Sequence, residues 1–191
     1  MLTLQTFISG IELLKKCYIG WQFDTKDEAQ VKVWYSSFRN LTDEQFKNLI
    51  KDYYTHNKQP PKSVRDLTDI LVDKFYATAK VPPEKALPLI KEIISDCGGW
   101  EYGGKKQIYE KLKSYPASLM ETVVEFESSL KTMTANDPYI AERFRKAYAT
   151  RLRASAIREV DKRLGLALPE PSKQVPVIES GTLGRAIPYE E

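Results

Sequence analysis

The most constraining feature of this sequence is the stretch of residues 32–70, KVWYSSFRNLTDEQFKNLIKDYYTHNKQPPKSVRDLTDI. Apolar side chains recur in it at helical spacing in two groups, first Trp34, Tyr35 and Phe38, then Phe46, Leu49, Ile50 and Tyr53. Pro60 and Pro61 forbid continuation of the second helix, because proline lacks a backbone N–H and restricts the residue before it. The stretch therefore predicts two helices, a rigid stop and the start of a third helix.

Serine and threonine residues mark where these helices begin. In a capping box, a Ser or Thr and an acidic or amide residue three positions later each bond the other's backbone N–H. The pairs with this spacing are Thr25 with Glu28, Thr42 with Gln45 and, with an aspartate in the second place, Ser63 with Asp66. We therefore expect helices to start near residues 25, 43 and 64.

The same reasoning along the whole chain predicts an all-α protein. The expected helices cover residues 4–18, 25–39, 43–55, 64–79, 84–97, 105–114, 117–131 and 138–164. A second double proline after Val81 separates a compact N-terminal bundle of about four helices (1–80) from a second helical unit (81–164). Residues 165–191 hold four prolines and no sustained helical period, so we expect an extended tail, either a frayed terminus or a segment that orders on contact with a partner.

Positive charge is concentrated in the last expected helix. The whole chain of 191 residues carries a net charge of only +3, yet residues 138–163 hold eight Lys or Arg against three Asp or Glu, a local charge of +5. Residues 164–191 hold two against four, a local charge of −2. Within the basic helix, apolar residues repeat every four positions and predict a packed ridge: Ile140, Phe144, Tyr148 and Leu152. The basic character thus belongs to one element.

The sequence offers little for catalysis, so we expect no enzymatic activity, cofactor or metal. The single histidine, His56, lies in a polar turn and has no nucleophile in its vicinity along the chain. The glycine-rich string at residues 98–106 has the spacing of a phosphate-binding loop, but Lys106 replaces the Ser or Thr that would hold magnesium. Asp66, Asp69 and Asp73 alternate with basic residues and fit a solvated helix face.

Cysteine usage and hydropathy favour a cytoplasmic protein. Cys17 and Cys97 are far apart and outside any CxxC context, which predicts free, buried thiols in a reducing compartment. Two cysteines and one histidine cannot easily supply the four ligands of a structural zinc site. No apolar run reaches the roughly 20 residues that a membrane span needs, and the start of the chain lacks the pattern of a signal peptide.

Two parts of the chain resemble the phage replicative helicase loader/inhibitor family. The first is the order Trp34-Tyr35, then Tyr53-Tyr54, then a double proline followed by Ser63-Val64-x-Asp66-Leu67. The second, a looser match, is the F-x-K-A-Y segment that begins at Phe144, with the Arg-rich segment after it. The resemblance spans most of residues 4–171 and is weakest over residues 80–135.

This resemblance implies a function without catalysis. Members of the family bind a hexameric DnaB-type replicative helicase, inhibit its ATPase and unwinding, and help load it at the phage origin in the cytoplasm of the bacterial host. A phage origin-binding initiator is a further candidate partner, for the N-terminal unit. The anchors that we expect on the helicase lie in the last helix and are Arg143, Phe144, Tyr148, Arg151, Leu152 and Ile157. Phe144 and Tyr148 fit a core position as well.

Two other functions compete with helicase binding. A DNA-binding replisome organiser would use the same basic helix against phosphates, although a net charge of +3 is small for a dedicated DNA reader. A structural or assembly protein would use the helix only as a solvated amphipathic element. Direct DNA binding would be recognised by an affinity that falls steeply with salt.

Overall fold

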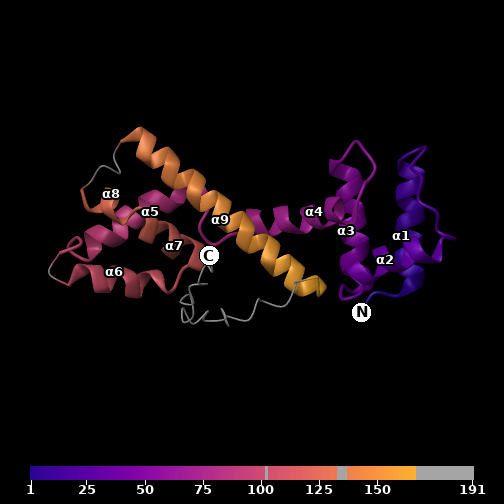
Figure 1. The fold of residues 1–191 in the computed structure, drawn as a ribbon, viewed down its shortest axis with the longest axis horizontal. Helices are drawn as coiled ribbons and strands as arrows, with labels where there is room; N and C mark the ends of the chain where they lie inside the picture. Colours follow the sequence, from indigo (N-terminus) through magenta and orange to yellow (C-terminus); the bar gives the residue numbers. More distant parts are fainter. Residues whose placement is uncertain (102, 133–136, 167–191) are drawn as a thin grey trace, which may run out of the picture.

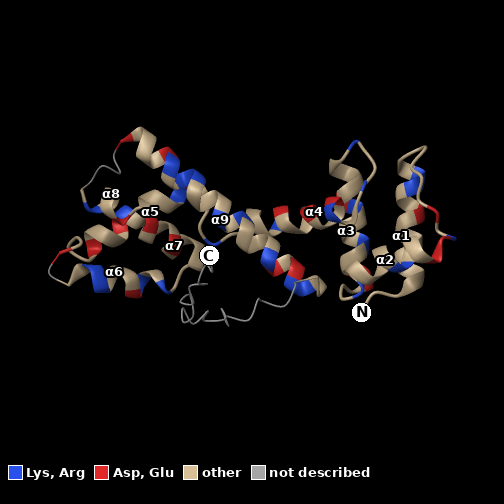
Figure 2. Ribbon diagram, viewed as in Figure 1, with Lys and Arg blue, Asp and Glu red and all other residues tan. Residues whose placement is uncertain are grey.

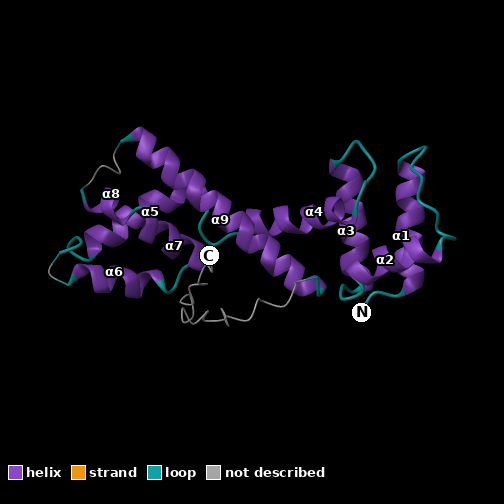
Figure 3. Ribbon diagram, in the orientation of Figure 1, coloured by secondary structure: helices purple, strands orange, loops and turns teal. Residues whose placement is uncertain are grey.

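The computed structural model describes residues 1–101, 103–132 and 137–166. Every regular element in these ranges is a helix, so the all-α prediction is confirmed (Figure 3). In chain order the helices are α1 (Leu4–Cys17), α2 (Glu28–Phe38), α3 (Asp43–His56), α4 (Val64–Ala77), α5 (Pro83–Asp96), α6 (Gly104–Leu112), α7 (Ala117–Glu125), α8 (Glu127–Lys131) and α9 (Pro138–Leu164).

Two of the three expected helix starts are confirmed. At α3, the Thr42 hydroxyl accepts from the Gln45 N–H at 3.2 Å and the Gln45 side chain accepts from the Thr42 N–H at 2.9 Å. At α4, the Asp66 carboxylate accepts from the backbone N–H of Ser63 at 3.0 Å. These contacts satisfy N–H groups that a helix start leaves without a partner.

The expected start of the second helix near residue 25 is wrong. Asp27 caps α2, and its carboxylate accepts from the N–H groups of Ala29 and Gln30 at 2.9 and 3.1 Å. The Thr25 hydroxyl instead donates to Glu12 of α1 at 2.7 Å. Aspartate and threonine are both good N-cap residues. Because Thr25 bonds Glu12 of α1, Asp27 is left to cap α2.

The helix expected over residues 117–131 is in fact two helices, α7 and α8. The break lies at Phe126, whose ψ of 11° departs from helical geometry. The Phe126 ring is buried and packs edge-on against Phe144 of α9 at 5.3 Å between centroids. The interruption therefore places an aromatic side chain of the connecting residue in the core.

The buried apolar side chains form two clusters. The N-terminal cluster joins α1–α4, with Phe7, Phe38, Phe46 and Leu67 among its fully buried members. The C-terminal cluster joins Val81 with α5–α9. The two clusters lie at opposite ends of an elongated molecule, with α1–α3 at one end and α5–α8 at the other (Figure 1).

Helix α9 contributes to both clusters. Phe144, Tyr148 and Leu152 are buried in the C-terminal cluster, whereas Ala156, Val160 and Leu164 are buried in the N-terminal cluster. Near its end, the Asn40 side-chain amide donates to the carbonyl of Leu164 at 3.0 Å. The division into domains at residues 1–80 and 81–164 stays a prediction. Helix α9 belongs to the second range but packs against both clusters.

The sequence of α9 explains how one helix serves two cores. Its buried residues recur every four positions from Phe144 to Leu164. Because a helix turns by about 100° per residue, each four-residue step advances the stripe by about 40° around the axis. Over the five steps the stripe turns by about 200°. The two halves of α9 therefore bury different faces, centred about 120° apart, in agreement with α5 and α7 below it and α4 above it in Figure 1.

The double proline at the joint is held against α9. Pro83 begins α5, and the preceding Val81 is buried. The hydroxyl of Tyr148 donates to the Val81 carbonyl at 2.9 Å.

At the other end of α9, Gly165 adopts a φ of 71° and closes the helix, a conformation that favours glycine. The expected tail lies almost wholly outside the described residues, which end at Leu166.

Candidate binding surface

The apolar residues expected to anchor a partner are core residues. Phe144 and Tyr148 are 1% and 0% exposed, and Leu152 is buried beside them. Their placement as surface anchors is therefore wrong, and the alternative that Phe144 and Tyr148 belong to the core is confirmed. Ile157 is half-buried and packs against the N-terminal cluster. The packed ridge that the four-residue repeat predicts is confirmed for Phe144, Tyr148 and Leu152.

Tyr148 shows how completely this core is closed. Burial raises the pKa of its hydroxyl to about 12. Its hydroxyl donates to the Val81 carbonyl described above. A group this buried has a structural role, since any partner would have to open the core to reach it.

Both expected arginine anchors reach the surface of α9. The Arg143 guanidinium is exposed and lies 5.9 Å from the ring centroid of Phe126 and 5.8 Å from that of Tyr139. Arg151 is partly exposed, contacts Glu125 of α7 and lies 4.0 Å from Glu121. The structure thus keeps Arg143 open to a partner and engages Arg151 with two acidic side chains of its own chain.

Other cations of α9 are paired inside the protein. Arg145 and Lys146 contact Glu142 at 2.7 and 3.5 Å, and the Arg145 guanidinium with its hydrogen bond lowers the pKa of Glu142 to about 2. Arg163 contacts Glu159 at 3.0 Å and lies 4.6 Å from the Phe75 ring centroid. Glu142 thus shares its one carboxylate between two cations, whereas Glu159 pairs with Arg163 alone.

Arg158 and Lys162, like Arg143, lack the ion pairs of the other cations of α9. Within the residues that the structure describes, neither forms an ion pair, and both side chains are exposed. They are four residues apart and share a side of the helix with Arg143 and Arg151, within an arc of about 100°. We call these four residues the basic side of α9. Figure 2 shows the blue segments that mark Lys and Arg along this helix.

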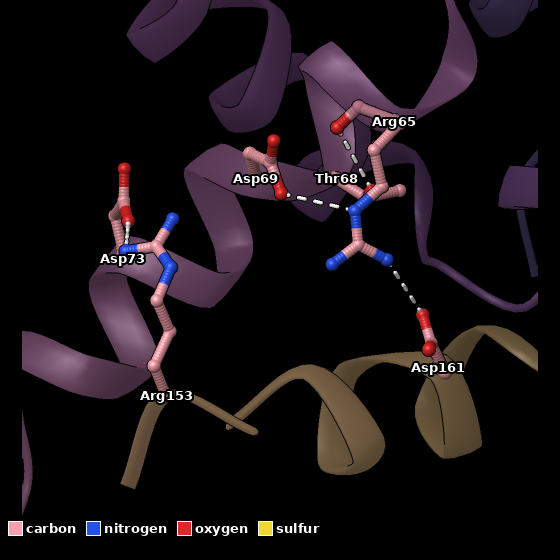
Figure 4. A network of polar contacts seen from close by, with 6 residues as sticks. All are labelled: Arg65, Thr68, Asp69, Asp73, Arg153 and Asp161. Atoms are coloured by element: carbon pink, nitrogen blue, oxygen red, sulfur yellow. Dashed lines mark hydrogen bonds and ion pairs between the residues drawn. The ribbon is translucent and has the colours of Figure 1, made fainter. Parts of the chain in front are cut away.

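A polar network joins α4 to α9 beside the basic side (Figure 4). Arg65 contacts Asp69 at 3.0 Å within α4 and Asp161 of α9 at 3.5 Å. Arg153 of α9 contacts Asp73 at 2.9 Å. Two of the three aspartates expected on a solvated face thus pair with arginines, and the third, Asp66, caps α4. The acidic residues of α4 help to position α9.

A groove lies where α3, α4 and the end of α9 meet. Its volume is about 530 Å³, and its lining residues are Asn40, Leu41, Gln45, Asn48, Leu49, Leu71, Lys74, Phe75, Val160, Arg163 and Leu164. The sequence did not predict this groove. The apolar spacing of each helix identifies buried residues, but the hollow depends on how three helices cross, which has no local signal.

The structure shows no catalytic constellation in its described residues. His56 is exposed at the end of α3, with its Nδ1 atom 2.8 Å from the carbonyl oxygen of Asp52. The two cysteines do not pair; Cys17 is exposed and Cys97 half-buried, so the expectation of buried thiols is wrong for Cys17. No group of three or more His, Cys, Asp or Glu side chains in the described ranges could hold a metal ion.

Turn geometry explains the glycine-rich string between α5 and α6. The N–H of Gly99 donates to the carbonyl of Ile94 at 2.9 Å and closes α5 at a φ of 92°. A Cβ atom on Gly104 would lie 2.0 Å from the Gly99 carbonyl oxygen. Glycine is thus required at both positions by the backbone itself, and a phosphate is not needed to account for either residue.

Comparison of the chain with protein-family models, with curated proteins and with solved structures finds no match. No helix among the described residues combines the length and the apolar character required to cross a membrane.

Proposed function

We propose that this protein binds a hexameric DnaB-type replicative helicase in the cytoplasm of a phage-infected bacterium, inhibits its ATPase and unwinding, and helps load it at the phage origin. The sequence resemblance over residues 32–70 and 138–163 supports the identity of the partner. The basic side of α9 is the observation that carries the proposal, since three of its four cations, Arg143, Arg158 and Lys162, are exposed and form no ion pair with a carboxylate of the described residues.

The physical basis of the contact is charge complementarity. Arginine forms bidentate bonds with carboxylates and is favoured at the centres of protein interfaces. Arg143, Arg158 and Lys162 would meet acidic side chains of the helicase, and Arg151 would exchange Glu125 for a carboxylate of the partner. Binding one nucleotide state of the hexamer more tightly than another shifts the population toward that state. Inhibition would follow if the favoured state cannot complete the ATPase cycle.

The first test is complex formation with the purified hexamer. The proteins are mixed with and without a slowly hydrolysed ATP analogue, and the products are weighed by light scattering after size exclusion. We expect a complex whose yield depends on the nucleotide, together with a fall in helicase ATPase activity. A hexamer that elutes alone in both conditions, with its ATPase unchanged, would contradict the proposal.

Direct DNA binding remains the second candidate, because Arg158 and Lys162 could equally meet phosphates. This candidate predicts an affinity that falls with salt at a log–log slope of about −0.9 for each phosphate contacted. Titration of labelled duplex and single-stranded DNA across a salt series measures the slope. An affinity that is undetectable at low salt would remove this candidate and leave helicase binding unaffected.

A further inference from the structure

The groove at the end of α9 has an apolar floor. Leu41 and Leu49 come from α3 and the turn before it, Leu71 and Phe75 from α4, and Val160 and Leu164 from α9. Apolar side chains of an extended segment could be buried against this floor. Such burial stabilises the contact by about 25 cal/mol for each Å² of apolar surface removed from water. The groove is open at the surface, so a segment could enter it without unfolding a helix.

The rim of the groove carries two cationic side chains. Its lining residues include Lys74 and Arg163 and not a single carboxylate. The side chain of Lys74 contacts Asp52 and that of Arg163 contacts Glu159, yet the two cationic side chains are 55% and 62% exposed. Each retains N–H groups directed at solvent, since an ammonium has three donors and a guanidinium five. The rim therefore suits an acidic ligand.

Polar amides complete the rim. Asn40, Gln45 and Asn48 line the groove, and each side chain can donate and accept hydrogen bonds. The backbone of an extended segment needs partners of this kind, because its own N–H and C=O groups are otherwise left without them. An extended peptide with apolar side chains and nearby carboxylates thus matches the apolar floor, the cations of the rim and the amides of the rim.

The chain itself supplies such a segment next to the groove. Leu164 lines the groove, Gly165 turns the backbone out of α9, and Leu166 is 40% exposed. Residues 167–191 follow, with four Glu against one Lys and one Arg. The eight residues 167–174 span up to about 26 Å when extended, so the segment after them can return to the groove.

We propose that residues 175–179, VPVIE, bind in this groove of their own chain. Val175, Val177 and Ile178 would cover the apolar floor, and Glu179 would lie within reach of Lys74 and Arg163. Because the segment is tethered, its effective concentration at the groove is in the millimolar range, and a weak contact is enough to fill the site. This inference does not depend on the helicase as a partner.

The test compares amide chemical shifts of the full-length protein with those of Val177→Asp/Ile178→Asp. Carboxylates at these positions would lose their hydration against the apolar floor, which disfavours binding. We expect shifts to change at the amides of residues that line the groove, Asn48 and Lys74 among them, and to stay constant in α5–α7. Shift changes confined to the substituted positions and their sequence neighbours, or changes centred on another surface, would overturn the proposal.

A pair of matched rim variants tests the contribution of charge. Asn48 is exposed and takes no part in the Thr42–Gln45 capping box, so its replacement should leave the fold intact. Asn48→Glu should release the segment and reproduce the shifts of the tail variant, whereas Asn48→Lys should retain it. Equal spectra for the two variants at tail positions would contradict binding in the groove.

Dilution separates binding in the same chain from binding to a second copy. Contact within one chain predicts shifts that are independent of protein concentration, from about 20 μM to 1 mM, because the effective concentration of a tethered segment does not change on dilution. Loss of the groove shifts at the lower concentration would show that the occupant belongs to another molecule and would overturn the assignment to the same chain.

Discussion

At the scale of single residues, a few buried or part-buried polar contacts connect parts of the chain that are far apart in sequence. Tyr148 bonds the carbonyl of Val81, 67 positions away, and the Asn40 side chain bonds the carbonyl of Leu164, 124 positions away. A buried carbonyl that loses its partner costs more than the bond contributes, because the group stays desolvated. These contacts therefore fix the joint between α4 and α5 and the end of α9.

Tyr148→Phe should destabilise the protein by about 1–3 kcal/mol, because the buried carbonyl of Val81 would keep its place without a donor. Urea denaturation at neutral pH, followed by circular dichroism, measures the loss. Tyr139→Phe is the matched control, since Tyr139 is 68% exposed and removal of its hydroxyl should leave stability unchanged. Equal urea midpoints for the two variants would show that the Tyr148 hydrogen bond does not contribute to stability.

Glu127 should contribute stability that depends on pH. Lys131 and Lys105, with the hydroxyl of Tyr109, lower its pKa from 4.5 to about 2. Since the pKa is lower in the folded state, the contribution is complete above about pH 4.5 and is lost as pH falls toward 2. Glu127→Gln should therefore cost about 1 kcal/mol at pH 7, and the difference from wild type should shrink below pH 4.5. A difference of the same size at pH 7 and pH 2.5 would contradict this account.

At the scale of elements, α9 is the component on which the rest of the fold depends. Its buried stripe turns around the helix, so its first half completes the C-terminal cluster and its second half the N-terminal cluster. The surface ion pairs that link it to α4 are exposed, and pairs of this kind contribute at most about 1 kcal/mol each. Apolar burial, with a few buried hydrogen bonds, therefore holds α9 in place.

Substitutions in the two halves of α9 should loosen different parts of the protein. Phe144→Ala should cost about 3–5 kcal/mol and speed hydrogen exchange mainly in α5 and α7. Leu164→Ala should cost about 2–5 kcal/mol and speed exchange mainly in α3 and α4. Hydrogen exchange read by mass spectrometry on the full chain distinguishes the two patterns. Identical exchange profiles would mean that the clusters open together, against the division described here.

At the scale of the whole molecule, much of the fold could be predicted from local patterns. The sequence predicts eight helices, the all-α class and the four-residue repeat of α9, because apolar spacing, caps and prolines act locally. The start of α2 and the break at Phe126 could not be predicted, since they depend on Glu12 in another helix and on the ring of Phe144. Local signals do not contain such contacts.

The candidate site could be predicted only in part. The concentration of arginines in α9 is visible in the sequence. Which of them form ion pairs depends in part on carboxylates of α4 and α7, which only the folded structure brings close to α9. The four-residue repeat predicts the buried positions of Phe144 and Tyr148 correctly, whereas their expected role as anchors followed from the family resemblance and from the residue types of binding hot spots. The groove arises from three helices and has no local pattern.

The most direct test of the central claim compares two pairs of substitutions that remove equal charge from α9. Arg158→Ala/Lys162→Ala removes two cations of the basic side, and Arg145→Ala/Lys146→Ala removes two that Glu142 already pairs. Affinity for the hexameric helicase, bound to a slowly hydrolysed ATP analogue, is measured by fluorescence anisotropy of the labelled protein. We predict a loss of at least about tenfold, or 1.4 kcal/mol, for the first pair and little change for the second. Equal affinities for the two pairs, with both variants folded, would contradict binding through the basic side of α9.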